Sequence, residues 1–171
     1  MYRQTLFSHP INERDTSRAI SREDKVNTEP SKLDIELQGE TPQHLSYNAL
    51  TGMPARRSIR FSGMVHGRQL RILMDGGSSN NFIHPSLINR LNISIYPTPL
   101  FKVQVGNGQL LQCEGVVRDV PVKIQDKLLF ITAFVLPIAT EELVLGDIWL
   151  ETLDTHLVNY KEKFITFFDN G

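Results

Sequence analysis

One carboxylate in this sequence stands where its side chain could do chemistry. Asp75 follows the apolar run 72–74, and Gly76, Gly77 and Ser78 come directly after it. The apolar run is typical of a strand that enters a core, and paired glycines are typical of a sharp turn. Because burying an unpaired carboxylate is costly, we expect Asp75 to have either a hydrogen-bonded partner or a chemical task.

The segments on either side of Asp75 predict short elements. Residues 59–65 alternate apolar and polar side chains, and a His-Gly turn at 66–67 leads into the apolar run at 70–74, which indicates a hairpin. Residues 85–91 begin with proline and continue with apolar side chains at helical spacing, so they predict a short helix. Upstream, residues 45–50 form a short alternating stretch.

A second hairpin is predicted around an asparagine-glycine pair. Residues 101–105 and 109–113 flank Gly106, Asn107 and Gly108. Asparagine and glycine both tolerate the positive φ angles that tight hairpin turns require. The tip of this hairpin is therefore expected to project as a loop.

The second half of the chain predicts more short strands. Gly146 ends one of them, and Asp147 is placed to act as the N-cap of a short helix over 147–150. Short strands separated by turn signals predict a closed, mostly β fold that is interrupted by two short helices. The strands are expected at residues 116–124, 128–136, 143–145, 156–160 and 164–168.

Composition divides the chain near residue 46. Residues 1–45 are polar, carry 6 Lys/Arg and 8 Asp/Glu, and show no sustained periodicity. Such a segment buries too little apolar surface to offset the entropy of ordering it, so we expect a flexible lead-in, with a binding tail as the alternative. Residues 46–171 are expected to form the one folded domain.

Charge and cysteine content restrict the class of protein. The formal net charge of −1 argues against a strongly basic nucleic-acid surface. No apolar run approaches the roughly 20 residues that cross a bilayer, and the first residues do not resemble a secretory signal. A single cysteine, Cys113, excludes an internal disulfide and fits a reducing compartment. We therefore expect a cytoplasmic protein without a membrane partner.

Other chemistries find little support. The five histidines are scattered at positions 9, 44, 66, 84 and 156, and no zinc-binding spacing occurs, so the sequence predicts no metal and no other cofactor. The Gly76-Gly77-Ser78 stretch could bind phosphate through backbone N–H groups. However, the lysine of a phosphate-binding loop is missing, and Asp75 would repel the anion.

Three stretches, in this order, resemble the retropepsin-like aspartic proteases, specifically the protease of gypsy-type long-terminal-repeat retrotransposons of plants. Residues 72–83 resemble the catalytic loop, and residues 101–108 look like a flap strand with its tip. Residues 144–150, which include Leu145 and Gly146, are similar to the segment that closes the fold beside the site. The resemblance covers about residues 46–168 and implies a single-lobed, retropepsin-like (acid protease) β-barrel.

The resemblance also implies an activity, that of an aspartic endopeptidase that processes a retrotransposon polyprotein. In this chemistry two carboxylates share one proton, one as a general base toward water and the other as an acid toward the carbonyl oxygen. Because the sequence holds one suitable Asp-x-Gly, a homodimer would have to supply Asp75 twice. An extended polypeptide substrate would lie under a flap formed by Val105, Gly106, Asn107 and Gly108, for which a plain surface turn is the alternative.

One position departs from the pattern of the family. The residue after the catalytic Asp is usually Ser or Thr, whose hydroxyl bonds across the dimer, and here it is Gly76. Losing a hydrogen bond of about 0.5–1.5 kcal/mol per chain would weaken the dimer without abolishing it. Ser78 matches the position whose hydroxyl donates to the catalytic carboxylate. The alternative function is a catalytically inactive or domesticated dimerisation or peptide-binding module.

Overall fold

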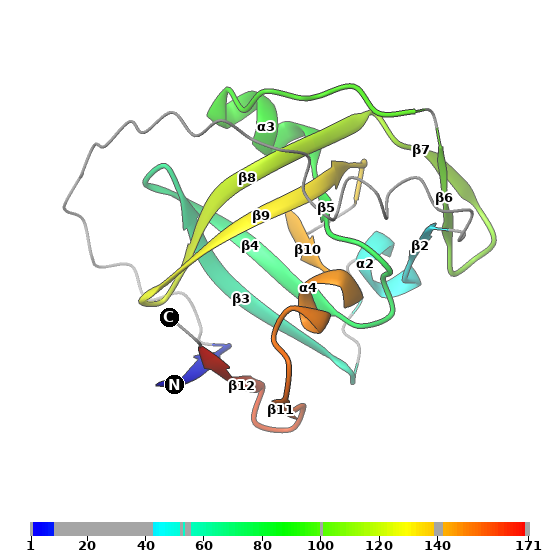
Figure 1. Ribbon diagram of the computed structural model, residues 1–171. Helices are drawn as coiled ribbons and strands as arrows, with labels where there is room; N and C mark the ends of the chain where they lie inside the picture. The colour runs from blue at the N-terminus through cyan, green and yellow to red at the C-terminus, as the bar shows by residue number, and fades with distance from the viewer. Residues whose placement is uncertain are drawn as a thin grey trace.

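The computed structural model describes residues 2–8, 43–51, 53, 56–99, 101–138 and 142–169, and its centre is a closed barrel. The strands follow one another around the barrel in the order β10-β4-β3-β8-β9-β5 (Figure 1). The predicted closed, mostly β fold is confirmed. The barrel strands are β3 (Ser58–Val65), β4 (Arg68–Asp75), β5 (Phe82–Ile83), β8 (Gly115–Ile124), β9 (Lys127–Val135) and β10 (Leu143–Leu145).

Two hairpins supply most of the barrel wall, and the strands of both were predicted from the sequence. In the β3–β4 hairpin, Val65 pairs with Arg68, and the two turn residues His66 and Gly67 have φ angles of 48° and 75°. These positive angles match the twist of the strands that the turn joins. The longer β8–β9 hairpin crosses over β3 and β4 in Figure 1.

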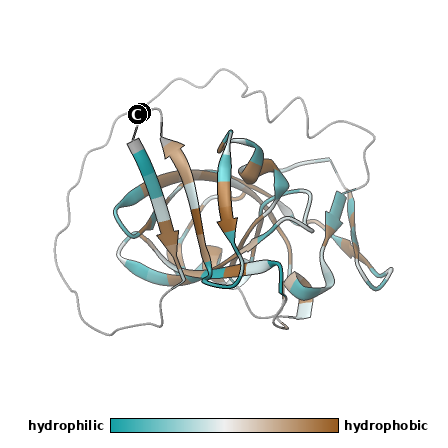
Figure 2. Cartoon of the chain, turned by 90° about the horizontal axis from the view of Figure 1, so that it is seen from below, coloured by the Kyte–Doolittle hydropathy of each residue, from teal (hydrophilic) through white to brown (hydrophobic). Residues whose placement is uncertain are grey.

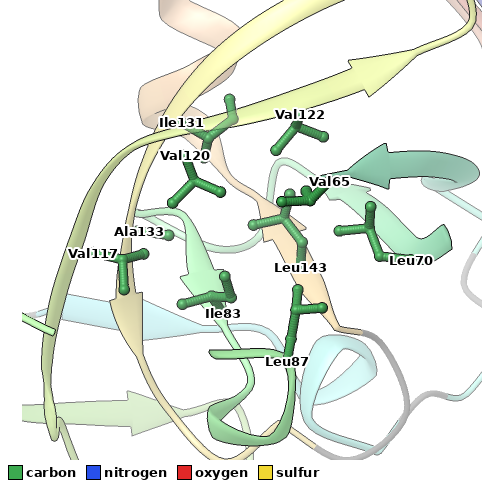
Figure 3. Close-up of a pocket in the computed structure, with 10 residues that line it drawn as sticks. All are labelled: Val65, Leu70, Ile83, Leu87, Val117, Val120, Val122, Ile131, Ala133 and Leu143. Carbon is green, nitrogen blue, oxygen red and sulfur yellow. The ribbon is translucent and has the colours of Figure 1, made fainter. Parts of the chain in front are cut away.

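The barrel interior is an apolar core. Ten side chains converge there (Figure 3), and they leave no room for a water molecule between them. Hydrophobic and hydrophilic stretches follow one another along the strands (Figure 2), as expected where one face of each strand is buried. The lining residues are Val65, Leu70, Ile83, Leu87, Val117, Val120, Val122, Ile131, Ala133 and Leu143.

Three short helices accompany the strands in the described part of the chain. The two predicted ones are α3 (Pro85–Leu91) and α4 (Asp147–Glu151). The third, α2 (Tyr47–Thr51), lies where the sequence alternates, because the Ser46 side chain caps the helix by accepting the Ala49 N–H at 3.0 Å. At the start of α3, His84 is the N-cap and accepts the Ser86 N–H at 3.0 Å.

The predicted N-cap of α4 is wrong by one residue. Gly146 occupies the cap in extended conformation, and Asp147 is the first residue of the helix, without a side-chain cap bond. The backbone N–H of Asp147 instead donates to the Ser78 carbonyl at 2.8 Å. This tertiary hydrogen bond, rather than local capping, fixes where the helix begins.

The chain ends meet in a separate three-stranded sheet, β1-β12-β11, in which β1 (Tyr2–Phe7) pairs antiparallel with β12 (Phe164–Asp169). The remaining strand, β11 (His156–Asn159), pairs along the other edge of β12. The prediction of a flexible lead-in is therefore wrong for residues 2–7, where Leu6 is buried. Its partner strand lies more than 150 positions away, so no local periodicity announces it.

A second small sheet joins residues 43–45 to the predicted flap. In it β2 (Gln43–Leu45) runs parallel to β6 (Lys102–Val105), which pairs in turn with β7 (Leu110–Gln112). The flexible lead-in is thus wrong for β2 as well, and residues 9–42 lie outside the described residues. Figure 1 shows β2 and α2 between the β6–β7 hairpin and the barrel.

Two further properties bear on the class of protein. Burial raises the pKa of the Cys113 thiol, so this cysteine is held in its unreactive protonated form. Among the helices that the structure describes, not one has the length and apolar character needed to span a membrane.

Candidate active site

Asp75 is the last residue of β4 and lies at the edge of the barrel. Its neighbour in β4, Met74, pairs with Leu145 of the parallel strand β10, and Asp75 itself pairs with Ser58 of β3. Only 5% of Asp75 is exposed to solvent. A central strand thus delivers this carboxylate into a tight loop, as the sequence predicts.

Three donors from the same chain bind the Asp75 carboxylate. The backbone N–H of Gly77 donates to Oδ1 at 3.1 Å. The Ser78 hydroxyl donates to Oδ2 at 3.1 Å, which is the bond expected of Ser78. A second hydroxyl, that of Ser46, also donates to Oδ2. The negative charge is therefore compensated by hydrogen bonds and needs no counter-ion to be buried.

The segment that precedes α2 holds the outer side of the loop. The Ser79 N–H donates to the His44 carbonyl at 3.0 Å, and the His44 N–H donates back to the Ser79 hydroxyl at 2.8 Å. The Ser46 N–H donates to the Ser78 hydroxyl at 3.1 Å. These bonds tie the loop after Asp75 to residues about thirty positions upstream.

Gly146 holds the inner side of the loop. A Cβ atom on it would lie 2.3 Å from the Asn80 carbonyl oxygen and 2.4 Å from that of Ser78, so no larger residue fits. Its N–H donates to the Asn81 Oδ1 at 3.0 Å. Leu145 and Gly146 thus lie beside the site, as expected from the resemblance.

Gly76 faces the start of α4. A Cβ atom on Gly76 would lie 3.2 Å from Asp147 Oδ1, closer than most Cβ contacts. Partial desolvation, followed by the charges of Glu151 and Asp75, raises the pKa of the Asp147 carboxyl above its ordinary value. The charge of Asp75 therefore acts on a second carboxylate of the same chain.

The predicted flap is a hairpin anchored at its base. Val105 is buried, and its N–H donates to the Gln109 carbonyl at 2.8 Å. At the tip, Gly108 adopts a φ of 84°, and the Asn107 side chain accepts the Gln109 N–H at 2.9 Å. The Gly106 N–H donates to the Leu45 carbonyl at 3.2 Å, which links the flap to β2. The same short strand therefore contacts both the loop after Asp75 and the β6–β7 hairpin.

The structure thus brings together Asp75, Gly76, Gly77, Ser78, Leu145 and Gly146, and connects the flap to them through β2. Sequence reasoning missed Ser46, His44 and Asn81. Only Ser46 had a usable signal, as a serine before a short helix. Across the described ranges, no group of three or more His, Cys, Asp or Glu side chains could hold a metal ion.

Comparison with known proteins places this site in a family. Residues 71–170, which include Asp75, the loop after it and Gly146, match the PEG10/RTL1 protease domain. The chain belongs to this family of protease domains. No curated protein matches the chain.

Solved structures agree with the fold of this family. The retroviral protease-like domain of Ddi1 from Leishmania major superposes with a TM-score of 0.51 at 15% identity, over 66% of this chain and 88% of that domain. This match shows that the barrel is retropepsin-like, as predicted.

Two weaker matches are of the same kind. A retropepsin-like aspartic protease from Rickettsia conorii matches with a TM-score of 0.45 and 12% identity, over 64% of this chain and 81% of that one. EIAV protease in complex with the inhibitor HBY-793 matches with a TM-score of 0.47 and 18% identity, over 63% of this chain and 98% of that one.

Proposed function

We propose that this chain is an aspartic endopeptidase that acts as a homodimer, with one Asp75 from each chain activating water. The observation that carries the proposal is the buried Asp75 carboxylate, bound by three in-chain donors at the end of a barrel strand. In a member of a protease-domain family, such a carboxylate has a chemical task as well as partners.

The mechanism needs two carboxylates that share one proton. Like charges a few ångströms apart cannot both ionise readily, so one carboxylate takes a proton from water while its protonated partner donates to the carbonyl oxygen. Asp147 is a poor second member, because it begins α4 and is exposed. We therefore assign the second carboxylate to Asp75 of a partner chain, related by a two-fold axis.

The substrate that we propose is an extended polypeptide. Its backbone would pair with a strand edge near the site, and the tip of the β6–β7 hairpin would close over it and exclude water. The resemblance to gypsy-type plant elements supports a retrotransposon polyprotein as the natural substrate. The single buried cysteine supports a reducing, cytoplasmic setting, and the net charge of −1 supports neither nucleic-acid nor membrane partners.

Cleavage of a peptide library by the purified full chain at acidic pH tests the proposal. We expect activity that rises faster than linearly with protein concentration, because the dimer is the active species. Asp75→Asn should abolish cleavage, whereas Asp126→Asn, an exposed carboxylate in the β8–β9 turn, should leave it unchanged. Cleavage that survives in Asp75→Asn would overturn the assignment.

A second candidate is a retropepsin-like module without protease activity, and Gly76 is the observation that favours it. Glycine at this position provides no hydroxyl for a bond across the dimer. A sedimentation experiment that shows a stable dimer, combined with no turnover of any peptide, would select this alternative.

A further inference from the structure

A hydroxyl outside the catalytic loop reaches Asp75. Ser46 donates to Asp75 Oδ2 from 29 positions away in the sequence. It lies between β2 and α2, on a segment that contacts both the loop after Asp75 and the β6–β7 hairpin. The loop residues alone therefore do not account for how the carboxylate is held.

The backbone of Ser46 is fixed from both sides. On one side, Leu45 pairs with Val105 of β6 and is 1% exposed. On the other side, Ala49 of α2 is fully buried, and the Leu50 N–H donates to the Ser46 carbonyl at 3.1 Å. The placement of the hydroxyl therefore follows from packed elements rather than from a mobile loop.

The direction of the Ser46 proton follows from its other hydrogen bond. A serine hydroxyl has one proton and two lone pairs. Ser46 Oγ accepts the Ala49 N–H at 3.0 Å, which occupies one lone pair. The Ser46 O–H then donates its hydrogen bond to Asp75 Oδ2. Ser78 repeats this pattern, because its hydroxyl accepts the Ser46 N–H at 3.1 Å and donates to the same Asp75 Oδ2.

We propose that Ser46 is a positioning residue that fixes the Asp75 carboxylate for the reaction. Gly76 has no hydroxyl that could bond across a dimer. The bond from Ser46 instead holds the Asp75 carboxylate from within the same chain. The inference rests on the proposed protease function for its kinetic consequences, but the contact with Asp75 can be tested separately.

The kinetic test compares Ser46→Ala and Ser46→Thr in the full chain. Ser46→Ala should lower kcat roughly tenfold or more, the size expected for losing one hydrogen bond to a charged group, with a smaller change in KM. The acidic limb of its pH–rate profile should move to higher pH, because one donor to the ionised carboxylate is gone. Ser46→Thr keeps the hydroxyl and should restore both.

Two further variants separate positioning from folding. Ser46→Gly keeps a residue that is tolerated at the N-cap of α2 but has no side-chain donor, so it should behave like Ser46→Ala even if the alanine variant folds poorly. Thr51→Ala removes a hydroxyl of α2 that bonds to the Tyr47 carbonyl and not to Asp75, so it should not move the pH profile. A shifted limb in Thr51→Ala would overturn the inference.

A measurement that needs no catalysis completes the test. The 13Cγ signal of Asp75 should change in Ser46→Ala and in Ser46→Gly, and stay in place in Thr51→Ala. An unchanged Asp75 signal in both Ser46 variants would overturn this inference whatever the activity. If the wild-type chain has no activity and the Asp75 signal still changes in the Ser46 variants, the proposed protease is overturned. The contact between Ser46 and Asp75 then stands.

Discussion

At the residue scale, the site consists of one buried charge and the donors that surround it. Both oxygens of Asp75 accept bonds from the chain itself, through Gly77, Ser78 and Ser46. Removing one such donor while the carboxylate stays buried leaves the charge partly unsatisfied. The free-energy penalty of this loss is larger than the net stabilisation from an average hydrogen bond. Variants at these positions should therefore change the pH dependence of the site as well as its stability.

Asp147 permits a prediction about pH. Because its pKa is raised in the folded state, its contribution to stability is present below its ordinary pKa of 3.8 and is lost as the pH rises through the raised value. Asp147→Asn should therefore increase the Tm at pH 7, and the increase should shrink as the pH falls below that ordinary value. Thermal unfolding at a series of pH values measures this difference.

The matched control for Asp147 is Asp126→Asn, an exposed carboxylate in the β8–β9 turn. This variant should give no comparable gain at pH 7. A gain for Asp147→Asn that is the same at every pH would contradict the electrostatic explanation and point to packing instead.

At the scale of elements, the loop after Asp75 is clamped between two segments that are far apart in the sequence. The β2–α2 segment binds it through His44 and Ser46, and the β10–α4 junction binds it through Gly146 and Asp147. Both segments belong to elements that pack into the barrel or into the β2-β6-β7 sheet. A distortion of either segment should therefore change the position of Asp75.

Gly146→Ala tests the second clamp. The added Cβ would lie 2.3 Å from one carbonyl oxygen and 2.4 Å from another, both of them backbone atoms that cannot turn aside. We expect a loss of about 1–3 kcal/mol in the free energy of unfolding, the usual cost of overpacking, together with reduced cleavage. Denaturant unfolding measures the loss of stability. Gly67→Ala is not a suitable control, because the positive φ of Gly67 would itself strain an alanine.

A better control for Gly146→Ala is Ser86→Ala on the exposed side of α3, which should cost far less. Stability unchanged in Gly146→Ala would mean that the loop can move away from β10 without penalty. The close approach of these backbones would then not be what positions Asp75.

At the scale of the whole molecule, the two ends of the chain form one sheet. The strand β1 pairs along all of β12, and Leu6 inserts into the same core cluster as the barrel residues Ile59 and Ile72. The folded unit therefore extends beyond residues 46–171, and a protein that begins at residue 46 would lose β1, β2 and the hydrogen bonds of β2 to the loop after Asp75.

Leu6→Ala tests whether β1 belongs to the cooperative fold. Replacing a buried leucine by alanine removes apolar contacts and leaves a cavity, so the free energy of unfolding should fall by about 2–5 kcal/mol. Arg3→Ala, on the exposed side of the same strand, should change it little. A negligible loss in Leu6→Ala would show that β1 can detach without unfolding the barrel.

Much of the fold could be predicted because its strands carry their own signal. The strand β3 alternates apolar and polar side chains, β4 and β9 contain apolar runs, and turns such as His66-Gly67 mark where the chain reverses. The strands β1 and β2 were missed because they are short and are stabilised by the partners β12 and β6 rather than by local pattern. Helix α2 was missed because its five residues depend on a serine cap and on burial of Ala49.

The sequence by itself determined that Asp75 ends a buried strand, that glycines follow it, and that Ser78 can reach it, because these relations span only a few residues. Only the tertiary structure decided that Ser46 also binds Asp75 and that Gly146 must lack a side chain. Such contacts join segments 29 or more residues apart, and their geometry is set by how the strands pair. Hydrogen bonds depend on distance in space, and a linear pattern does not record that distance.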